Sequence, residues 1–449
     1  MTSAADQLGV RVKGLLRRGP LAEPALASVL EVDQHALAQA LRPIEAALVR
    51  FSHDSSVQVA LRDEARSDLE TLIYEVSATG ALKELGTLVP VRPEGFVLKH
   101  RDGTGLHSEG LPWWLNDLRP QGYLGRIQAR RLSAELGLPP TLEDWSDTHA
   151  LRALIHEGEV LPGNLIVGQA AADRFLAASP PVPIPSDGKG QAYVALAAAA
   201  ARGEHHGPLL GGEQPKFTAY VEYPKGPAHV LVKFSDSSDT AASQRWRDLL
   251  LAEHLALEVL REQGIPAAQS TIIDHAGQRF LEVRRFDREG PTGRRGVVSI
   301  GTLDAEFAGT GESWPLATRA LVATGVIQPL AIPAVDLLWG FGTLIGNTDM
   351  HGGNLAFVTE QGQPYQGAPA YDMVPMAFAP PAESEVTQRP LNSTVGTSIA
   401  AETRLQLLGW TQTFLHRLEA NSRLSDGFAP CIGTCQMQLA RVQDGGEIG

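Results

Sequence analysis

Features that would place the chain outside the cytoplasm are scarce in its sequence. Only two of the 449 residues are cysteines, Cys431 and Cys435, so a disulfide framework is excluded and free or buried thiols in a reducing compartment are expected. The first ten residues lack the basic and then apolar layout of a signal peptide. Apolar runs such as 192–201 are rich in alanine and too short to span a bilayer. The sequence therefore predicts a cytoplasmic protein with no membrane partner.

Positive charge is also in deficit. The formal net charge is −13, with 38 Lys and Arg residues against 51 Asp and Glu residues. Such a protein is not a nucleic-acid coat, so any DNA contact would have to come from a local patch. The hydrophobic content of 43% is ordinary for a soluble globular protein. The length exceeds that of one ordinary core, so two or three domains are expected.

The N-terminal residues 1–65 predict a winged helix-turn-helix. The expected elements are, in order, helices at 8–16, 24–30 and 34–41 and strands at 48–51 and 57–61. Pro24 suits the first turn of the second helix, and Asp33 suits the N-cap of the third. Helix, turn, helix and β-wing in this order are typical of a DNA-binding module.

This module has two interpretations, DNA binding or a small helical dimerisation or docking role. The third helix offers DNA the polar residues Gln34, His35, Gln39 and Arg42, of which only Arg42 is basic. Residues 1–62 contain seven Lys or Arg residues against six Asp or Glu residues, a net charge of +1. That charge is weak for phosphate binding, so both interpretations stay open.

The segment 346–372 concentrates residues suited to phosphoryl transfer. This reaction needs a carboxylate that orients or deprotonates the attacking hydroxyl, and hard oxygen ligands for magnesium. Asp349 precedes Asn354 by five residues, the spacing at which protein kinases place the catalytic base and a metal-binding asparagine. Asp372 follows an expected hairpin and would supply the second metal ligand. His351 is expected to support the loop by hydrogen bonding.

Two other interpretations of this segment stay open. A sequence rich in Asn, Asp and Gly also suits a turn with no catalytic role. Asp349 and His351 could instead ligate the metal ion of a hydrolase, although oxygen ligands of the magnesium type dominate the cluster.

ATP binding by a kinase needs a glycine-rich turn and a lysine on a strand, and no Walker P-loop is present. The candidate cofactor-binding residues are Gly211, Gly212, Gln214, Lys216, Lys233, Glu253, Arg285, Phe286, His351 and Asn354. Lys233 ends an apolar strand and could reach the α- and β-phosphates, and Glu253 on the following helix could pair with it. Arg285 and Phe286 suit a hinge whose backbone meets adenine. The alternatives are an ordinary Gly-Gly turn, a solvated edge lysine and a solvated glutamate on a helix face.

At these residues the sequence resembles the HipA family of bacterial serine/threonine kinases. The matching segments, in family order, are Gly-Gly-Glu-Gln-Pro-Lys (211–216), Val-Leu-Val-Lys-Phe (230–234), Arg-Arg-Phe-Asp-Arg (284–288), Gly-Asn-Thr-Asp-Met-His-Gly-Gly-Asn (346–354) and Tyr-Asp-Met-Val-Pro (371–375). The resemblance covers residues from about 85 to 440. It implies ATP and Mg²⁺ as cofactors, with Asp349 as catalytic base, Asn354 and Asp372 as magnesium ligands, and Lys233 as a phosphate contact.

The sequence resembles in particular the longer YjjJ-type members, which carry an additional N-terminal helix-turn-helix. In residues 1–65 such a module would take over the role of the separate DNA-binding antitoxin of ordinary members. Two positions depart from the family pattern. Leu209-Leu210 stand where members carry an autophosphorylated serine, so self-inactivation is not expected there. Met350 replaces the usual arginine after the catalytic aspartate, which would change how the loop is held or lower the activity.

We therefore expect an α+β, bilobal, protein-kinase-like (HipA-like) fold with an N-terminal winged helix-turn-helix. The expected domains are the N-terminal module at 1–65, a HipA N-terminal subdomain at 66–205, and a kinase core at 206–449 with a small lobe to about 290 and a helical large lobe after it. The expected activity is that of a HipA-type toxin kinase acting on a Ser or Thr of a host protein. The resemblance makes a translation factor or an aminoacyl-tRNA synthetase a plausible acceptor. A small-molecule phosphotransferase and a DNA-binding regulator with a nucleotide-sensing, weak or inactive kinase domain are the alternatives.

Overall fold

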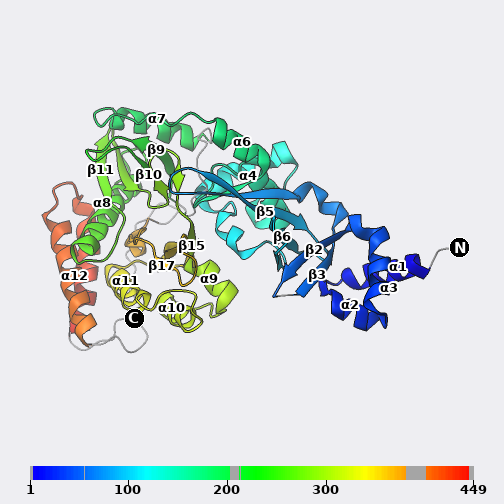
Figure 1. Ribbon diagram of the computed structural model, residues 1–449. Coiled ribbons are helices and arrows are strands. Elements are labelled where there is room, and N and C mark those ends of the chain that lie inside the picture. The colour runs from blue at the N-terminus through cyan, green and yellow to red at the C-terminus, as the bar shows by residue number, and fades with distance from the viewer. Residues whose placement is uncertain (1–3, 55, 203–211, 213, 381–400, 444–449) are drawn as a thin grey trace. The chain divides into compact units, whose positions relative to one another are not determined.

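The computed structural model describes residues 4–54, 56–202, 212, 214–380 and 401–443. The chain divides into two compact units (Figure 1). The first unit contains residues up to 179 except 78–80 and 122–124, which belong to the second unit with the residues from 180 onwards. Both units contain helices and strands, which confirms the expected α+β class. The division into three domains stays a prediction.

The N-terminal part of the first unit contains the expected elements in the expected order. They are α1 (Ala4–Leu16), β1 (Leu21–Ala22), α2 (Glu23–Leu30), α3 (Gln34–Leu41), a 3₁₀ helix at Arg42–Ala47, β2 (Leu48–His53) and β3 (Ser56–Leu61). The strands form an antiparallel sheet in the order β1-β3-β2. The Asp33 side chain accepts a hydrogen bond of 2.7 Å from the amide of Ala36, which confirms the expected N-cap of α3.

The rest of the first unit is a five-stranded sheet with helices. The sheet order is β7-β6-β5-β4-β8, with the strands β4 (Thr71–Val76), β5 (Leu82–Pro90), β6 (Phe96–Lys99), β7 (Gly105–Ser108) and β8 (Leu165–Val167). The helices are α4 (Gly122–Leu136), whose first turn is grouped with the second unit, α5 (Asp147–His156) and α6 (Gln169–Ala177), with 3₁₀ helices at Glu64–Leu69, Trp113–Leu118 and Leu142–Asp144.

One apolar cluster joins the two parts of the first unit. Val49 and Phe51 of β2 pack with residues of β5 and β6, the strands drawn beside β2 and β3 in Figure 1. The buried members are Val49, Phe51, Ala60, Val89, Val91 and Val97. The N-terminal elements and the five-stranded sheet therefore share an apolar core. Burial of this apolar area stabilises their packing against each other.

The second unit begins with a four-stranded antiparallel sheet between two helices. The sheet order is β11-β12-β10-β9, with β9 (Lys216–Val221), β10 (Ala228–Phe234), β11 (Ser270–His275) and β12 (Gln278–Arg284). Helix α7 (Lys189–Ala201) precedes the sheet in the chain, and α8 (Ala241–Glu262) connects β10 to β11. Short strands β13 (Arg288–Glu289) and β14 (Gly293–Arg294) follow.

The two helices cover opposite faces of this sheet. Tyr193 of α7 packs in one apolar cluster with Val232 of β10. The next residue, Lys233, is bonded to Glu253 of α8. Successive side chains of a strand point to opposite faces, so β10 contributes to the core on the α7 side and to a charged cluster on the α8 side.

The remainder of the second unit is mainly helical, as expected for the large lobe. Its helices are α9 (Ile300–Phe307), α10 (Trp314–Ala323), α11 (Ala331–Ile345), α12 (Ala401–Ala420) and α13 (Ala429–Gln443), with 3₁₀ helices at Gly352–Asn354, Met376–Phe378 and Asp426–Phe428. A small sheet, in the order β15-β16-β17, contains β15 (Val297–Ser299), β16 (Ala356–Val358) and β17 (Gln366–Gly367).

The expectation of free or buried thiols is met. Cys431 and Cys435 on α13 are free and buried. Among the helices that the structure describes, none combines the length and the apolar character needed to cross a membrane.

Candidate active site

Helix α11 delivers the loop that carries the candidate catalytic residues. Phe341, Leu344 and Ile345 are fully buried, which anchors the C-terminal end of the helix in the core. The helix ends at Gly346, whose φ of 82° is the left-handed conformation that glycine adopts without steric cost. The chain therefore leaves the core at a defined point and enters the loop 347–354.

Hydrogen bonds within this loop hold Asp349 in place. The amide of Asp349 donates to the side-chain oxygen of Asn347 over 3.1 Å, and its carbonyl oxygen accepts from the Asn354 side-chain amide over 2.8 Å. The Asp349 residue itself is exposed. The amide of Gly353 donates to Nδ1 of His351 over 3.0 Å, so His351 supports the loop as expected. The loop thus presents a carboxylate at the surface from a fixed backbone.

Asp372 returns the chain to this loop after β16 and β17. Its φ of 55° is left-handed, a conformation that costs a residue other than glycine about 1 kcal/mol or more. The side-chain amide of Asn347 donates to the Asp372 carbonyl oxygen over 3.4 Å. The aspartate expected to bind metal and the loop of the expected base are therefore in direct contact, in a backbone state that the surroundings must impose.

Lys233 lies between two carboxylates. Its Nζ atom donates to both carboxylate oxygens of Glu253 at 2.8 Å, and it also pairs with Asp372. Lys233 is 3% exposed and Glu253 is 1% exposed. The interpretations of Lys233 as a solvated edge lysine and of Glu253 as a solvated helix residue are therefore wrong.

Burial and charge act in opposite directions on the pKa values of this cluster. Burial would lower the pKa of Lys233, but Asp372 and Glu253 outweigh it and raise that pKa above the ordinary value. Burial raises the pKa of Glu253 to about 7 against the opposing effect of Lys233. Burial also acts to raise the pKa of Asp372, but Lys233, Lys216 and His351 together leave it below its ordinary value. Asp372 is therefore the carboxylate that stays ionised at neutral pH.

Lys216 is a second buried lysine at the same place. It lies opposite Lys233 in the β9–β10 pair and is 3% exposed. A Cβ atom built on Gly212 would lie only 2.7 Å from Nζ of Lys216, so the ammonium group lies against the glycine turn. Two neighbouring lysines next to a glycine turn supply ammonium donors that suit contact with phosphate.

Gln214 is the other described residue of the glycine-rich segment. It is 9% exposed, and within the described part of the chain neither of its side-chain polar atoms has a hydrogen-bond partner. A buried amide is costly unless a partner satisfies it, so this position suits contact with a polar ligand. Gly211, the expected first glycine of the turn, and Leu209-Leu210 lie outside the described residues.

The two expected hinge residues occupy different surroundings. The Arg285 guanidinium donates to both carboxylate oxygens of Asp287, at 2.8 and 2.6 Å, and is not bonded to the lysine cluster. The ring of Phe286 lies 5.7 Å from that of Tyr371, centroid to centroid. The Tyr371 hydroxyl in turn donates to the Gly353 carbonyl oxygen over 2.6 Å. Phe286 therefore lies beside the catalytic loop, whereas the side chain of Arg285 is engaged within its own segment.

The oxygen donors present fit Mg²⁺. Magnesium is commonly held by one or two protein oxygens together with substrate phosphates and water. Asp372 supplies a carboxylate, and the bonded amide nitrogen of Asn354 leaves its amide oxygen available. Among the described residues, no group of three or more His, Cys, Asp or Glu side chains could hold a metal ion.

Sequence reasoning missed the side chains that pack behind the loop. A Cβ atom on Gly342 of α11 would lie 2.4 Å from the sulfur of Met350 and 3.2 Å from that of Met373. Each methionine directly follows one of the candidate aspartates, Asp349 and Asp372. Where members of the family carry an arginine, this chain has Met350, whose apolar side chain packs on α11. The position of each methionine next to a candidate aspartate is visible in the sequence. Its contact with Gly342 is visible only in the tertiary structure.

The chain matches two known families and one characterised relative. Residues 68–176 match the family described as YjjJ-like toxin, middle domain, and residues 209–422 match the HipA-like C-terminal domain. Toxin YjjJ from Escherichia coli strain K12 is 35% identical over 433 residues, which cover 96% of this chain and 97% of that protein.

Two solved structures resemble the chain more distantly. HipA of Shewanella oneidensis MR-1, in its complex with HipB and operator DNA, aligns with a TM-score of 0.48 and 15% identity over 83% of this chain and 97% of its own. The Helicobacter pylori proinflammatory kinase CtkA aligns with a TM-score of 0.35 and 14% identity over 51% of this chain and 91% of its own.

Proposed function

The chain belongs to the HipA-like family, in the branch that contains Toxin YjjJ, and from this premise we propose that it is an ATP- and Mg²⁺-dependent kinase that phosphorylates Ser or Thr residues of a protein. Family membership supports a phosphotransferase in general. The choice of a hydroxyl on a protein as acceptor is the further step that an experiment must test.

The observation that carries the proposal is the charge cluster formed by the buried Lys233 and Glu253 and the partly buried Asp372, with the buried Lys216 beside it. Removing several charges from water costs more than their mutual attraction usually returns, so such a cluster is a poor device for stability alone. The same groups suit a site that binds phosphates through lysines and a cation through a carboxylate. We infer that the cluster is retained for binding MgATP.

Each residue has a proposed role in the transfer. Lys233 and Lys216 contact the ATP phosphates, Glu253 orients Lys233, and Asn354 and Asp372 hold Mg²⁺, which neutralises phosphate charge when bound. Asp349 accepts the proton of the acceptor hydroxyl. The hydroxyl oxygen then forms a bond to the γ-phosphorus, the bond between that phosphorus and the β–γ bridging oxygen breaks, and ADP leaves.

The remaining candidates complete the nucleotide site. We propose that Gly211, Gly212 and Gln214 lie along the phosphates and that the backbone near Phe286 meets the adenine ring. The side chain of Arg285, bonded to Asp287, would act by holding this segment rather than by touching ATP.

The acceptor and the biological effect rest on the relatives. Toxin YjjJ is named as a toxin, so we propose that phosphorylation by this chain harms the host cell. A translation factor or an aminoacyl-tRNA synthetase is the proposed class of acceptor. Normal growth under strong induction of the active protein would count against toxicity.

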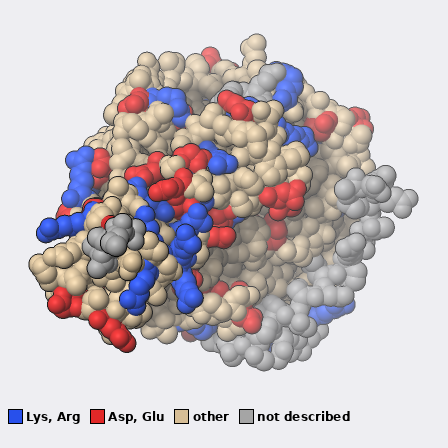
Figure 2. All heavy atoms as spheres, turned by 90° about the vertical axis from the view of Figure 1, so that its right-hand side faces the viewer, with Lys and Arg blue, Asp and Glu red and all other residues tan. Residues whose placement is uncertain are grey.

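We also propose that the N-terminal elements form a winged helix-turn-helix that binds DNA and regulates the protein's own expression. The order α1, β1, α2, α3, β2, β3 supports this, as does the exposure of Gln34, His35, Gln39 and Arg42 on or next to α3. Figure 2, seen from the N-terminal end, shows both Lys/Arg and Asp/Glu on the nearest surface. Binding would therefore depend on a few local contacts, and its salt dependence would be correspondingly shallow.

Transfer of labelled γ-phosphate into a host-cell lysate tests the proposal. The lysate is dialysed, and the purified chain is incubated with labelled ATP and Mg²⁺ in the macromolecular fraction and in the small-molecule fraction separately. Label on Ser or Thr of a protein is the expected result. Label on a metabolite alone would indicate a small-molecule phosphotransferase, and ATP binding without transfer would indicate a nucleotide-sensing DNA regulator.

A further inference from the structure

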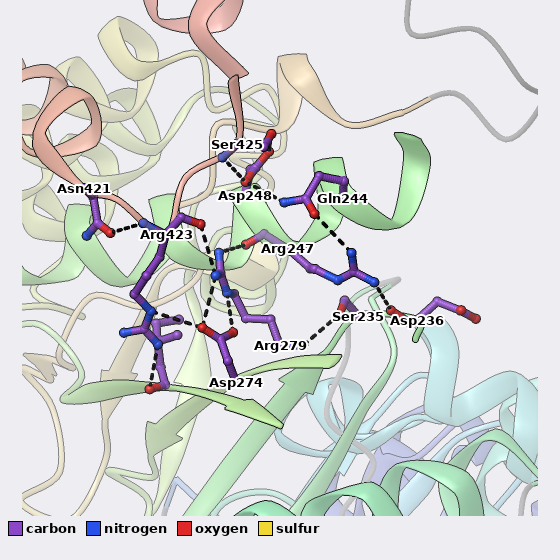
Figure 3. A network of polar contacts seen from close by, with 11 residues as sticks. Ser235, Asp236, Gln244, Arg247, Asp248, Asp274, Arg279, Asn421, Arg423 and Ser425 are labelled. Carbon is purple, nitrogen blue, oxygen red and sulfur yellow. Dashed lines mark hydrogen bonds and ion pairs between the residues drawn. The ribbon is translucent and has the colours of Figure 1, made fainter. Parts of the chain in front are cut away.

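The segment 421–428, which connects α12 to α13, is bonded to the small-lobe elements of the second unit. Figure 3 shows this network, in which side chains of the segment converge with those of α8, β11 and β12. Several of these contacts join the segment to α8, the helix that carries Glu253.

The first group of contacts joins the segment to α8 through Asp248. This carboxylate is 1% exposed and accepts hydrogen bonds from the amide of Ser425, over 3.1 Å, and from the Ser425 hydroxyl. Gln244, one turn earlier on α8, donates to the same carboxylate over 3.2 Å. Burying a carboxylate without hydrogen-bond donors costs free energy. The two hydrogen bonds from Ser425 therefore stabilise Asp248 in its buried position.

The second group joins the segment to the sheet beneath α8. Arg423 donates to Asp274 over 3.1 Å and to the Ile272 carbonyl oxygen over 3.2 Å. Arg279, which is 5% exposed, bonds Asp274 and also donates to the carbonyl oxygens of Arg423 and Arg247. One guanidinium thus links β12, α8 and the segment at a single point.

The third group reaches the turn that follows Asp372. Arg245 of α8 donates to the Phe378 carbonyl oxygen over 3.1 Å and to the Gly427 carbonyl oxygen over 3.0 Å. Its guanidinium lies 5.4 Å from the centroid of the Phe428 ring, which meets the Phe378 ring edge to face. The α8 helix, the turn after Asp372 and the segment are therefore tied through one side chain.

These contacts restrict the movement of α8. Glu253 lies five residues after Asp248, about 7.5 Å along the same helix axis. At the far end, Arg417 of α12 pairs with Glu262 of α8, and α8 and α12 lie side by side (Figure 1). A helix held on both sides of Glu253 cannot turn or swing outward without breaking several buried hydrogen bonds. In protein kinases the ion pair between the strand lysine and the helix glutamate must be in place for activity, and the position of that helix is a point of control.

We propose that residues 421–428 act as an intramolecular clamp that positions Glu253 against Lys233, so that the nucleotide site is assembled in the free chain. The residues of the clamp are positioning residues, since none of them is bonded to the candidate catalytic groups. This inference rests on the proposed kinase function. It adds that no activating partner and no phosphorylation are needed to bring α8 into place.

The test loosens the clamp at its exposed side. Arg423→Ala with Ser425→Ala removes the side-chain bonds to Asp274, the Ile272 carbonyl oxygen and Asp248, leaves the bond from the Ser425 amide to Asp248, and opens no large cavity. Arg319→Ala is the matched control, because Arg319 of α10 makes a comparable two-bond pair with Asp336 of α11, and its hydrogen bonds lie within α10 and to α11. Arg423→Lys with Ser425→Thr keeps a positive charge and a hydroxyl and serves as the rescue variant.

Three quantities are measured on the full chain: amide hydrogen exchange in α8, the dissociation constant for ATP with Mg²⁺, and kcat with KM for ATP. If the clamp variant leaves about a tenth of the molecules with α8 in place, the apparent dissociation constant and KM rise about tenfold. Exchange in α8 rises, kcat at saturating ATP changes less than KM, and the rescue variant recovers much of the affinity.

A folded clamp variant with unchanged α8 exchange and unchanged ATP affinity would overturn the proposal, as would an equal loss in the Arg319→Ala control. Exchange and affinity do not require turnover, so the two proposals fail separately. A wild-type chain that transfers no phosphate, but whose α8 loosens and whose ATP affinity falls in the clamp variant, would refute the kinase and leave the clamp standing.

Discussion

Replacing Lys233 by methionine should destabilise the protein in a pH-dependent way. The substitution keeps the volume roughly constant but leaves Glu253 and Asp372 without the ammonium group that lies between them. Breaking a buried ion pair by removing one partner costs about 3–5 kcal/mol, because a buried charge is left uncompensated. We expect a loss of that size in the free energy of unfolding at pH 8.

The pH dependence follows from Glu253. Its pKa is raised to about 7 by burial even though Lys233 lowers it, so removing Lys233 should raise that pKa further. A carboxyl whose pKa is raised on folding binds its proton more tightly in the folded state than in the unfolded state. The free energy of unfolding therefore falls as pH rises from the unfolded pKa to the folded pKa. At pH 6 the variant holds Glu253 neutral, and we expect up to about 1.4 kcal/mol of the loss to be recovered for each pH unit between the variant's raised pKa and the wild type's pKa of about 7.

Urea denaturation of the wild type and the variant at pH 6 and pH 8 measures these quantities. The double variant Lys233→Met/Glu253→Gln removes the stranded charge and should be more stable than Lys233→Met alone at pH 8, while remaining without phosphotransfer. Lys225→Met, at an exposed turn, is the control and should change the stability by less than about 0.5 kcal/mol. A Lys233→Met protein as stable as the wild type at pH 8, or a loss equal at both pH values, would refute the reasoning.

Three further predictions concern the loop, the N-terminal module and the metal site. Gly342→Ala should lower stability by about 1–3 kcal/mol in thermal or urea denaturation, because its Cβ atom would lie 2.4 Å from the Met350 sulfur. Gly409→Ala, on α12 with nothing within 4 Å of the new Cβ atom, is its helical control and should be neutral or slightly stabilising; equal losses in both would contradict the packing argument. Asp33→Ala should cost about 1 kcal/mol and raise amide hydrogen exchange in α3, since the capping bond to Ala36 is lost, whereas unchanged exchange would show that the cap does not matter. Asp372→Asn should abolish most of the Mg²⁺-dependent gain in ATP affinity measured by calorimetry, and a gain as large as that of the wild type would exclude Asp372 as a metal ligand.

The residues of the candidate site could be predicted from the sequence where they lie a short distance apart in the chain. Asp349 and Asn354 lie on one loop, so their separation of five residues already limits the distance between their side chains. Lys233 at the end of an apolar strand and Glu253 on the next helix follow the same logic. The structure brings this pair together and buries it, because strand alternation directs Lys233 to the α8 face.

The parts that could not be predicted depend on contacts between distant segments. Gly342 looks like any helical glycine until Met350 is seen to pack against it. The bonds of Ser425 to Asp248 join positions separated by 177 residues, and no periodicity in either segment reports them. Sequence pattern predicts faces and spacings, whereas these features arise from packing.

The central claim is that Asp349 performs chemistry rather than supporting the loop. The direct measurement is the rate of γ-phosphate transfer to the protein acceptor by Asp349→Ala, with ATP affinity measured on the same preparation. The bonds of the Asp349 amide and carbonyl to Asn347 and Asn354 do not involve the substituted side chain, so these two bonds should remain in the variant. We predict a fall in rate of about 10²–10⁴-fold, with ATP affinity unchanged within a factor of about three. Transfer at the wild-type rate by a variant that still binds ATP would contradict the account.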